Sequence, residues 1–364
     1  MHVLALEPFY GGSHRAFLDG LIARSRHRFT LLTHPACFWK WRMRGAAITL
    51  ADEARRLPKP PDLIFASDML ALAEFKALSG LAAPTLLYMH ENQLSYPAAA
   101  PDPRDVHFGF TNLTSWLAAD RVLWNSQYHL ESCLAALPGF IAMMPDCRPR
   151  RIEDSIGEKS LVMPPGLDLA AIASHPVERD GGPPIIIWNH RWEFDKQPEV
   201  FFQAVDELDR AGVPFRLALL GENFRVQPQA FLDARERWGG RIVRFGYAED
   251  REEYLDWLRR GTVSVSTATQ ENFGLAAVEA AYAGAYPLWP DRLSYPELLG
   301  PEAGRGHLYS EFGELVVKLK MRMTGPPYDR DAHERMRRAL DRFDWSRRIG
   351  HYDDLIESTA TDRR

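Results

Sequence analysis

The stretch VSVSTATQENFGLAAVEAAYAGAYPLWP, residues 263–290, decides the fold class of this chain. It opens with an apolar run of strand length, continues through the helical pattern GLAAVEAAYAG and closes with a second apolar run, YPLWP. A buried strand, a helix and another buried strand in this order are typical of a parallel sheet covered by helices. The stretch therefore predicts an α/β fold.

The same alternation runs through the rest of the chain. In the first half, six apolar runs each end in polar or turn residues: HVLALEP, RFTLLTHP, DLIFASD, PTLLYMH, DRVLWNS and KSLVMPP. The alternation restarts at residue 185, after a segment with two glycines and three prolines, residues 168–184, which we interpret as an interdomain connection. We predict two doubly wound, Rossmann-like domains, residues 1–170 and 184–340, that face a central cleft. A long amphipathic helix is expected within residues 333–359, and packing of residues 341–364 against the first domain is one arrangement that we consider.

The composition is that of an ordinary globular protein. The chain has 364 residues, more than one hydrophobic core usually supports, and 46% of them are hydrophobic. No apolar run approaches the roughly 20 residues that cross a bilayer, and the first residues are too acidic for a signal peptide. Cys37, Cys133 and Cys147 are odd in number and lack the spacing of metal ligands. We expect a cytoplasmic protein without a disulfide framework or a metal site.

Charge is unevenly distributed along the chain. The net charge of −5 argues against a generic nucleic-acid binder, but residues 1–60 hold ten Lys and Arg against four Asp and Glu, a local net of +6. Within them, FWKWRMRG, residues 38–45, combines three cations with two tryptophans. If this segment is extended, alternate side chains face opposite sides, so that tryptophan is buried on one side while the arginines are solvated on the other. Three interpretations stay open: a solvated basic surface, a membrane-touching stripe, and contact with RNA phosphates and bases.

Polar residues follow many of the predicted strands. Because open α/β sheets bind ligands at the carboxyl ends of their strands, we expect these residues to line one site. In the first domain the candidates are Gly11, Gly12, Asp68, His90, Glu91 and Asn92, with Ser13 as a cap of the following helix. In the second domain they include Arg191, Lys196, Gly246 and Glu271.

The stretch ENFGLAAVE carries the strongest chemical signal. A helix that opens at Gly274 offers free N–H groups and the positive end of its dipole to a phosphate. Glu271 and Glu279 are eight residues apart, about 12 Å along a helix, so they can bracket a diphosphate. Arg191 and Lys196, in NHRWEFDKQP, supply two cations that would neutralise a departing diphosphate. Asp329 and Asp331, in YDRDAH, are interpreted as helix-capping or surface charges and not as metal ligands.

The second domain resembles the retaining, nucleotide-sugar-dependent glycosyltransferases of family four, which have the two-domain GT-B architecture. The matching parts are VMPPGLD, the R-x-x-x-x-K spacing of Arg191 and Lys196, FGY at 245–247, the spaced glutamates and FDWSRRIGHYDDL. The resemblance implies a metal-independent enzyme with no cofactor besides its sugar donor. It implies the following donor-binding residues: Gly11, Gly12, Arg191, Lys196, Gly246, Tyr247, Phe273, Gly274, Leu275 and Glu279. It also implies that Glu271 holds the transferred hexose.

Long strings in the first domain narrow the resemblance. FYGGSHR, FWKWRMRG, FASDML, YMHENQLSYP and FGFTNLTSWLAADRVLWNS are similar to the tRNA-queuosine mannosyltransferases. Members of that family move mannose from GDP-mannose to the cyclopentenediol of queuosine in the anticodon of an aspartate tRNA. The resemblance implies that His90 holds a hexose hydroxyl or the reacting geometry. It implies acceptor and RNA contacts at Trp39, Lys40, Trp41, Arg42, Arg44, Asp68, Glu91 and Asn92.

Other functions on the same scaffold stay open. A UDP-sugar donor with a lipid or glycan acceptor fits the same donor motifs, as does an epimerase that needs no acceptor. A catalytically idle RNA-binding relative would keep the fold and the basic segment. Nucleotide-sugar binding separates these classes, because an idle binder should respond to no donor.

Overall fold

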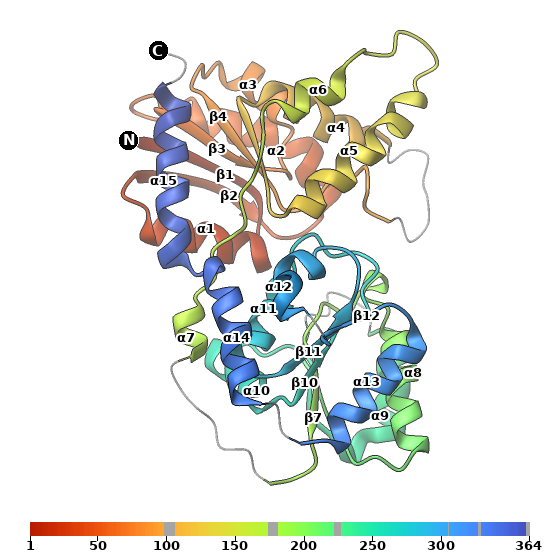
Figure 1. Ribbon diagram of the computed structural model, residues 1–364. Coiled ribbons are helices and arrows are strands. Elements are labelled where there is room, and N and C mark those ends of the chain that lie inside the picture. Colours follow the sequence, from red (N-terminus) through yellow and green to blue (C-terminus); the bar gives the residue numbers. More distant parts are fainter. Residues whose placement is uncertain (98–105, 174–180, 222–226, 305, 327–328, 362–364) are drawn as a thin grey trace. The chain divides into compact units, whose positions relative to one another are not determined.

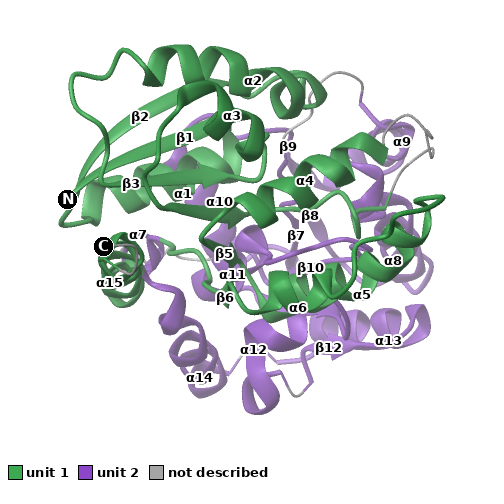
Figure 2. Cartoon of the chain, turned by 90° about the horizontal axis from the view of Figure 1, so that it is seen from above, with its two compact units in different colours: residues 1–167, 345–364 green, residues 168–344 purple. Residues whose placement is uncertain are grey.

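The computed structural model describes residues 1–97, 106–173, 181–221, 227–304, 306–326 and 329–361. They form two compact units (Figure 2). Unit 1 comprises Met1–Leu167 together with Trp345–Arg364, and unit 2 comprises Asp168–Asp344. None of the described helices is both long and apolar enough to span a membrane.

Unit 1 is a six-stranded parallel sheet covered by helices on both faces (Figure 1). Its strands are β1 (His2–Tyr10), β2 (Arg28–Pro35), β3 (Leu63–Ser67), β4 (Thr85–Met89), β5 (Arg121–Trp124) and β6 (Ser160–Val162). Its helices are α1 (Gly12–Arg24), α2 (Trp39–Ala54), α3 (Leu72–Ser79), α4 (Val106–Ala118), α5 (Gln127–Ala142), α6 (Ile152–Gly157) and α15 (Trp345–Thr361). The strand order is β2-β1-β3-β4-β5-β6. The predicted parallel α/β architecture is confirmed.

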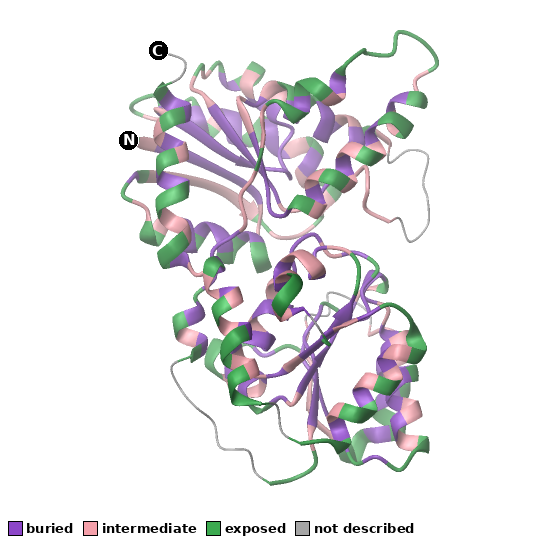
Figure 3. Cartoon of the chain, in the orientation of Figure 1, coloured by how far each residue is buried: buried purple, intermediate pink, exposed green. Residues whose placement is uncertain are grey.

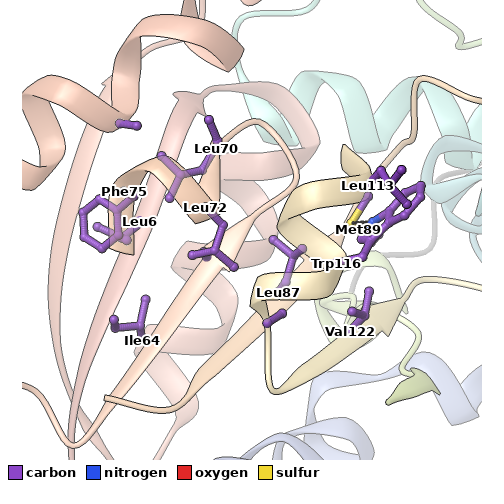
Figure 4. Packing of buried hydrophobic residues seen from close by; sticks show 14 of the residues in the cluster. Leu6, Ile64, Leu70, Leu72, Phe75, Leu87, Met89, Leu113, Trp116 and Val122 are labelled. Carbon is purple, nitrogen blue, oxygen red and sulfur yellow. Dashed lines mark hydrogen bonds between the residues drawn. The ribbon is translucent and has the colours of Figure 1, made fainter. Parts of the chain in front are cut away.

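Alternation along the strands divides the core of unit 1 between the two faces of the sheet. Leu6, Ile64 and Leu87 lie on the face that α2, α3 and α4 cover (Figure 4). The alternate positions, such as Phe65 and Tyr88, pack with α1 and α15 on the other face. Because both faces are covered, β1, β3, β4 and β5 are buried along most of their length, whereas the edge strands β2 and β6 are only partly buried (Figure 3).

The last helix, α15, belongs to the core of unit 1. Trp345, at its start, is only 3% exposed and packs with Phe17 and Tyr352. A Cβ at Gly20 would lie 2.4 Å from the indole Nε1, and one at Gly166 only 2.1 Å from the ring. The indole therefore fits because glycine occupies both positions.

Unit 2 contains a second six-stranded parallel sheet, with the strand order β12-β11-β10-β7-β8-β9. Its strands are β7 (Ile185–Trp188), β8 (Arg216–Leu219), β9 (Ile242–Phe245), β10 (Val263–Val265), β11 (Tyr286–Pro290) and β12 (Leu308–Tyr309). Its α-helices are α7 (Leu169–Ala173), α8 (Pro198–Arg210), α9 (Gln229–Trp238), α10 (Arg251–Arg260), α11 (Leu275–Ala283), α12 (Tyr295–Ala303), α13 (Phe312–Thr324) and α14 (Arg330–Leu340). Its described residues also form three 3₁₀ turns: η2 (Phe194–Lys196), η3 (Gly239–Arg241) and η4 (Asp341–Phe343). Counted from β7, this is the strand order of the Rossmann fold.

The C-terminal part of the chain differs from the prediction of one long helix within residues 333–359, which is wrong. Helix α14 ends at Leu340, a 3₁₀ turn follows, and α15 begins at Trp345. The break is fixed by two hydrogen bonds: Leu169 N donates to the Asp344 carboxylate (3.1 Å), and Trp345 N donates to the Leu167 carbonyl (3.0 Å). The interpretation of Asp329 as a helix cap is confirmed, because its carboxylate accepts from Ala332 N.

The predicted interdomain connection, residues 168–184, is only partly a connection. Its first residues form α7, which packs in unit 2, and Arg259 donates to the carbonyls of Ala171 (2.9 Å) and Ile172 (3.2 Å). Residues 174–180 lie outside the described part of the chain.

Candidate active site

The topology of unit 2 brings the segments after β7 and β10 together. These strands are neighbours in the sheet, and the order of the sheet reverses between them. In doubly wound folds this switch point is where ligands bind. Lys196 follows β7 and Glu271 follows β10, and the Lys196 Nζ lies 3.4 Å from the Glu271 Oε2.

Lys196 is buried among oxygen acceptors. Besides Glu271, its Nζ lies 2.6 Å from the Gln270 carbonyl oxygen and 3.1 Å from the Asp195 Oδ2. The side chain of Asp195 is 0% exposed and that of Lys196 is 7% exposed. Burial alone would lower the pKa of Lys196, but Glu271 and Asp195 outweigh burial and raise that pKa above its ordinary value. The ammonium is therefore held in its charged form.

Arg191 is the exposed cation of the same loop. Its guanidinium pairs with Glu193 at 3.4 Å, and its side chain is 44% exposed. His190, between Asn189 and Arg191, is buried, and burial lowers its pKa to about 4 with a further contribution from the charge of Lys196. The loop therefore offers one exposed and one buried cation beside a neutral imidazole.

Helix α11 opens next to Lys196 with its first N–H groups available to a ligand. Gly274 at the N-cap has a φ of +99°, which favours glycine, and among the described residues no side chain caps this end. Leu275 begins the helix. Phe273 is buried against Phe343, and Ser294 Oγ donates to its carbonyl at 2.8 Å. The turn is thus rigid, and its N–H groups and helix dipole suit a phosphate.

Glu279 lies further along α11 in a hydrogen-bonded network. Arg251 Nη2 lies 2.5 Å from its Oε1, and Tyr254 Oη donates to its Oε2 at 3.0 Å. Asn189 Nδ2 donates to Tyr254 Oη and to the Ala276 carbonyl, at 3.0 and 2.7 Å. Each carboxylate oxygen keeps a lone pair for a ligand hydroxyl. Sequence reasoning missed Arg251 and Tyr254, because an arginine and a tyrosine on an amphipathic helix carry no motif.

The two remaining donor-site candidates of unit 2 lie after β9. Gly246 has a φ of +98°, and its N–H donates to the Leu219 carbonyl at 2.9 Å. Tyr247 is 53% exposed. An exposed aromatic ring beside a left-handed glycine turn is suited to contact with a planar base.

Unit 1 has its own switch point between β1 and β3, where a buried cluster forms. Glu7 is fully buried; its Oε1 accepts from Phe9 N (2.9 Å) and Ser67 Oγ (3.0 Å), and its Oε2 lies 3.1 Å from His14 Nδ1. The rings of His14 and His90 stack with centroids 3.9 Å apart and planes inclined by 29°.

The charges of this cluster follow from its contacts. Burial lowers the pKa of His14, but Glu7 outweighs burial, and this pKa rises to about 9. Burial and the charge of His14 hold the pKa of His90 well below its ordinary value. One ring of the stack is therefore an imidazolium and the other is neutral.

Glu7, His14 and His90 have ligand atoms within 4.8 Å of one another, a spacing compatible with a metal ion. The stacked arrangement does not suit one. The ring centroids lie 3.9 Å apart with planes inclined by only 29°, whereas an ion shared by two imidazoles lies near the plane of each ring, about 2.1 Å from its nitrogen. The hydrogen bonds of Glu7 account for the cluster without an ion.

The other unit 1 candidates divide between structural and accessible groups. Asp68 Oδ2 accepts from Glu91 N at 3.0 Å, and burial raises the pKa of Asp68 to about 7. Asn92 is 1% exposed, and its Oδ1 accepts from the N–H groups of Leu94 (3.0 Å) and Ser95 (2.9 Å), so it shapes the turn. Glu91 is partly exposed, and its Oε1 accepts from Gln93 Nε2 at 3.2 Å.

The glycine pair opens α1 differently from the prediction. The expectation that Ser13 caps this helix is wrong: Gly11 is the N-cap, no side chain among the described residues caps the helix, and Ser13 lies in its first turn. A Cβ at Gly11 would lie 2.4 Å from the Ala36 Cβ, so the chain approaches the residue that follows β2 too closely for a side chain. Gly12 has a φ of +50°.

The basic aromatic segment is helical, and the extended conformation assumed for it is wrong. Helix α2 begins at Trp39, after Phe38 in a left-handed conformation. Trp39 packs with Met43 and Phe108, whereas Trp41 is 75% exposed and Phe38 is 61% exposed. An extended segment would place both tryptophans on the same side, whereas in a helix of 3.6 residues per turn positions two apart face nearly opposite sides.

The cations of α2 are engaged to different degrees. Lys40 Nζ lies 5.6 Å from the Trp39 ring centroid. Arg42 Nε donates to the Pro35 carbonyl at 3.1 Å. Arg44 pairs with Glu74 at 3.2 Å and donates to Thr111 Oγ1 at 3.0 Å. Part of the local positive charge is therefore internally neutralised.

Solved structures show the fold of this chain, and a family model for its second unit shows the class of enzyme. The UDP-forming α,α-trehalose-phosphate synthase from Burkholderia xenovorans matches with a TM-score of 0.70 and 15% identity, covering 99% of each chain. HepE from Anabaena, solved with UDP, matches with a TM-score of 0.68 and 16% identity, covering 98% of this chain and 100% of that one. The model of the family "Glycosyl transferases group 1" matches residues 173–330. The chain is a glycosyltransferase with the GT-B fold.

The first unit identifies the family more narrowly. Residues 2–167 match the model described as "tRNA-queuosine alpha-mannosyltransferase N-terminal". A Drosophila melanogaster protein named tRNA-queuosine alpha-mannosyltransferase is 36% identical over 334 residues, covering 87% of this chain and 86% of that protein. The chain belongs to the tRNA-queuosine alpha-mannosyltransferase family.

Proposed function

We propose that this protein transfers mannose from GDP-mannose to the cyclopentenediol of queuosine in the anticodon of tRNA-Asp, in the cytoplasm and without a metal ion or other cofactor. Membership of the family, supported over residues 2–167 as well as over the donor-binding part, is the observation that carries the proposal. The arrangement of charges in each unit supports it further.

Unit 2 holds the donor in this proposal. The diphosphate lies against Lys196, Arg191 and the opening of α11 at Gly274, which together supply positive charge where the leaving group becomes more negative. Glu271 accepts hydrogen bonds from the hexose, and Glu279 accepts them from the ribose hydroxyls, with Arg251 and Tyr254 fixing its orientation. The exposed ring of Tyr247 lies toward the base.

The transfer retains the configuration of the sugar. The bond between mannose C1 and the diphosphate oxygen breaks as the acceptor hydroxyl oxygen attacks the same face. The acceptor proton passes to the departing phosphate oxygen, so that the products are mannosylated nucleoside and GDP. His90, neutral in its stack on His14, positions a hydroxyl and is not required to carry a charge.

Unit 1 binds the RNA in this proposal. Phe38 and Trp41 present exposed aromatic faces at the start of α2, and stacking on aromatic side chains is the common way in which proteins hold unpaired bases. Lys40 and Arg42 lie on the same helix turn as partners for phosphates. Because both aromatic side chains are apolar and exposed on a basic helix, contact with the bases of an anticodon loop would be more favourable for them than contact with water.

The experiment is a transfer assay with purified protein and queuosine-containing tRNA. Incubation with GDP-mannose, UDP-glucose or ADP-glucose is followed by digestion and mass spectrometry of the nucleosides. A mass gain of one hexose on queuosine with GDP-mannose alone is expected, and tRNA that lacks queuosine is the matched control. A mass gain with another donor would show that the proposed donor sugar is wrong. No mass gain with any donor on any tRNA would refute the proposal.

A further inference from the structure

The environment of Lys196 raises the question of how a donor diphosphate reaches its ammonium. An ammonium group has three N–H donors. Three oxygens already lie within 3.4 Å of the Lys196 Nζ: the Gln270 carbonyl, Asp195 Oδ2 and Glu271 Oε2. A phosphate oxygen that binds this ammonium must therefore replace one of the three.

The three partners differ in how easily they can be replaced. The Gln270 carbonyl is backbone and has the shortest contact, 2.6 Å. Asp195 is 0% exposed, and moving its carboxylate away would leave a buried charge without a partner. Glu271 makes the longest contact, 3.4 Å, and is the most accessible carboxylate, with its side chain 19% exposed. Glu271 is therefore the partner that yields at the least cost.

The backbone around Glu271 allows its side chain to move alone. Ser294 Oγ donates to the carbonyls of Glu271 (3.2 Å) and Phe273 (2.8 Å), which fixes the turn before α11. A diphosphate carries more negative charge than one carboxylate, so it competes successfully for the ammonium. Once released, the Glu271 carboxylate gains acceptor capacity beside the bound donor.

We propose that Asp195 is a positioning residue that permanently holds Lys196, and that Glu271 is its exchangeable partner, displaced by the donor diphosphate and thereby freed for the sugar hydroxyls. This inference rests on the proposed function for the nature of the ligand. It adds an order of events: the sugar-binding carboxylate becomes available only when the diphosphate is in place. Empty enzyme keeps Glu271 neutralised by Lys196.

The experiment compares GDP binding by calorimetry in the wild type, Glu271→Gln and Glu199→Gln. Glu199 is an exposed residue of α8, so its replacement is a control for the change in net charge of unit 2. Glu271→Gln is expected to bind GDP about threefold to tenfold more tightly, because an ion pair that opposes binding is gone, while sugar transfer is strongly reduced. Unchanged or weaker GDP binding in Glu271→Gln would overturn the exchange.

The role of Asp195 has a separate readout, the pH dependence of GDP binding. Burial and the charge of Arg191 lower the pKa of Lys196, whereas the carboxylates of Glu271 and Asp195 raise it. In Asp195→Asn one of these two carboxylates is missing, so the pKa of Lys196 falls. GDP binding should therefore be lost at a lower alkaline pH than in the wild type. An unmoved pH profile in a folded Asp195→Asn variant would overturn the anchoring role, and the Glu271 comparison stands without this variant.

The nucleotide panel separates this inference from the proposed function. Wild-type protein is titrated with GDP, UDP and ADP before the variants are compared. If UDP or ADP binds in place of GDP, the donor is corrected, and the exchange is tested with the nucleotide that binds. If none of the three binds, the proposed function fails with it.

Discussion

The buried pair of Glu7 and His14 predicts a pH-dependent stability of unit 1. The pKa of His14 is about 9 in the folded protein, against 6.5 for an ordinary histidine. Because the folded-state pKa is the higher one, the charged imidazole stabilises the fold fully below about pH 6.5, and this contribution is lost as the pH rises through about 9. At about 1.4 kcal/mol for each pKa unit, roughly 2 kcal/mol should disappear between about pH 7 and pH 9.

Few other shifted groups disturb this pH window. Burial lowers the pKa values of His129 to about 3 and of His190 to about 4, so these side chains are already neutral there. Burial raises the pKa of Asp68 to about 7, so its neutral carboxyl group is the form that stabilises the fold. This contribution is lost as the pH rises toward about 7, which is mainly below the window. The Cys133 thiol has its pKa raised by burial, and its effect begins above about pH 9.

The assay is urea unfolding at several pH values, with hydrogen exchange of β1 and α1 peptides as the probe, because the chain has two units and a global signal would mix them. The wild type should lose about 2 kcal/mol of unfolding free energy between about pH 7 and pH 9. His14→Asn should remove most of this slope, and Glu7→Gln should reduce it because the imidazolium loses its counter-charge. A wild type and a His14→Asn variant with the same slope would refute the reasoning.

Three further predictions concern the core, the donor and the RNA. Trp345→Ala should destabilise unit 1 by about 3–5 kcal/mol, measured by the same unfolding assay, because the indole fills the core; a loss below about 1 kcal/mol would contradict its central packing. Lys196→Met should lower kcat by about 10²–10³-fold with a native circular dichroism spectrum, and ordinary turnover would remove the diphosphate argument. Trp41→Ala should weaken binding of an anticodon stem-loop by about 1–3 kcal/mol in a filter-binding assay, while Ile48→Ala, another exposed apolar position of α2, should not. Equal effects of both α2 variants would show that stacking is not the cause.

The parallel architecture was accessible from sequence because buried strands leave near-continuous apolar runs. The runs HVLALEP to KSLVMPP coincide with strands β1 to β6, the restart at residue 185 with β7, and the two runs of residues 263–290 with β10 and β11; the glycine at 274 lies where α11 opens. Strand β12 was not predicted, because Leu308–Tyr309 is too short to show a pattern. Neither were α12 and α13, which lie in a region without strong strand signals.

Contacts between residues that are distant in sequence determine the features that sequence patterns did not predict. Residues 38–45 contain alternating large side chains, and helical structure there depends on packing of Trp39 and Met43 against Phe108, which is distant in sequence. Likewise the long amphipathic pattern near the C-terminus is interrupted because Asp344 and Trp345 bond to residues at 167–169. Pairwise charge arrangements such as Glu7 with His14 are invisible in sequence, because the two residues belong to no common motif.

The membership of α15 in unit 1 has a consequence for biosynthesis. One side of the first sheet is covered only by α1 until Trp345 and the residues after it leave the ribosome, and all of unit 2 is translated before then. At roughly 5–20 residues per second, this delay lasts about 10–40 s, during which Phe17, Phe65 and Tyr88 are without their covering helix. Unit 2 can therefore finish folding before unit 1. Chaperones would be needed while the amino-terminal part of the chain is still without α15.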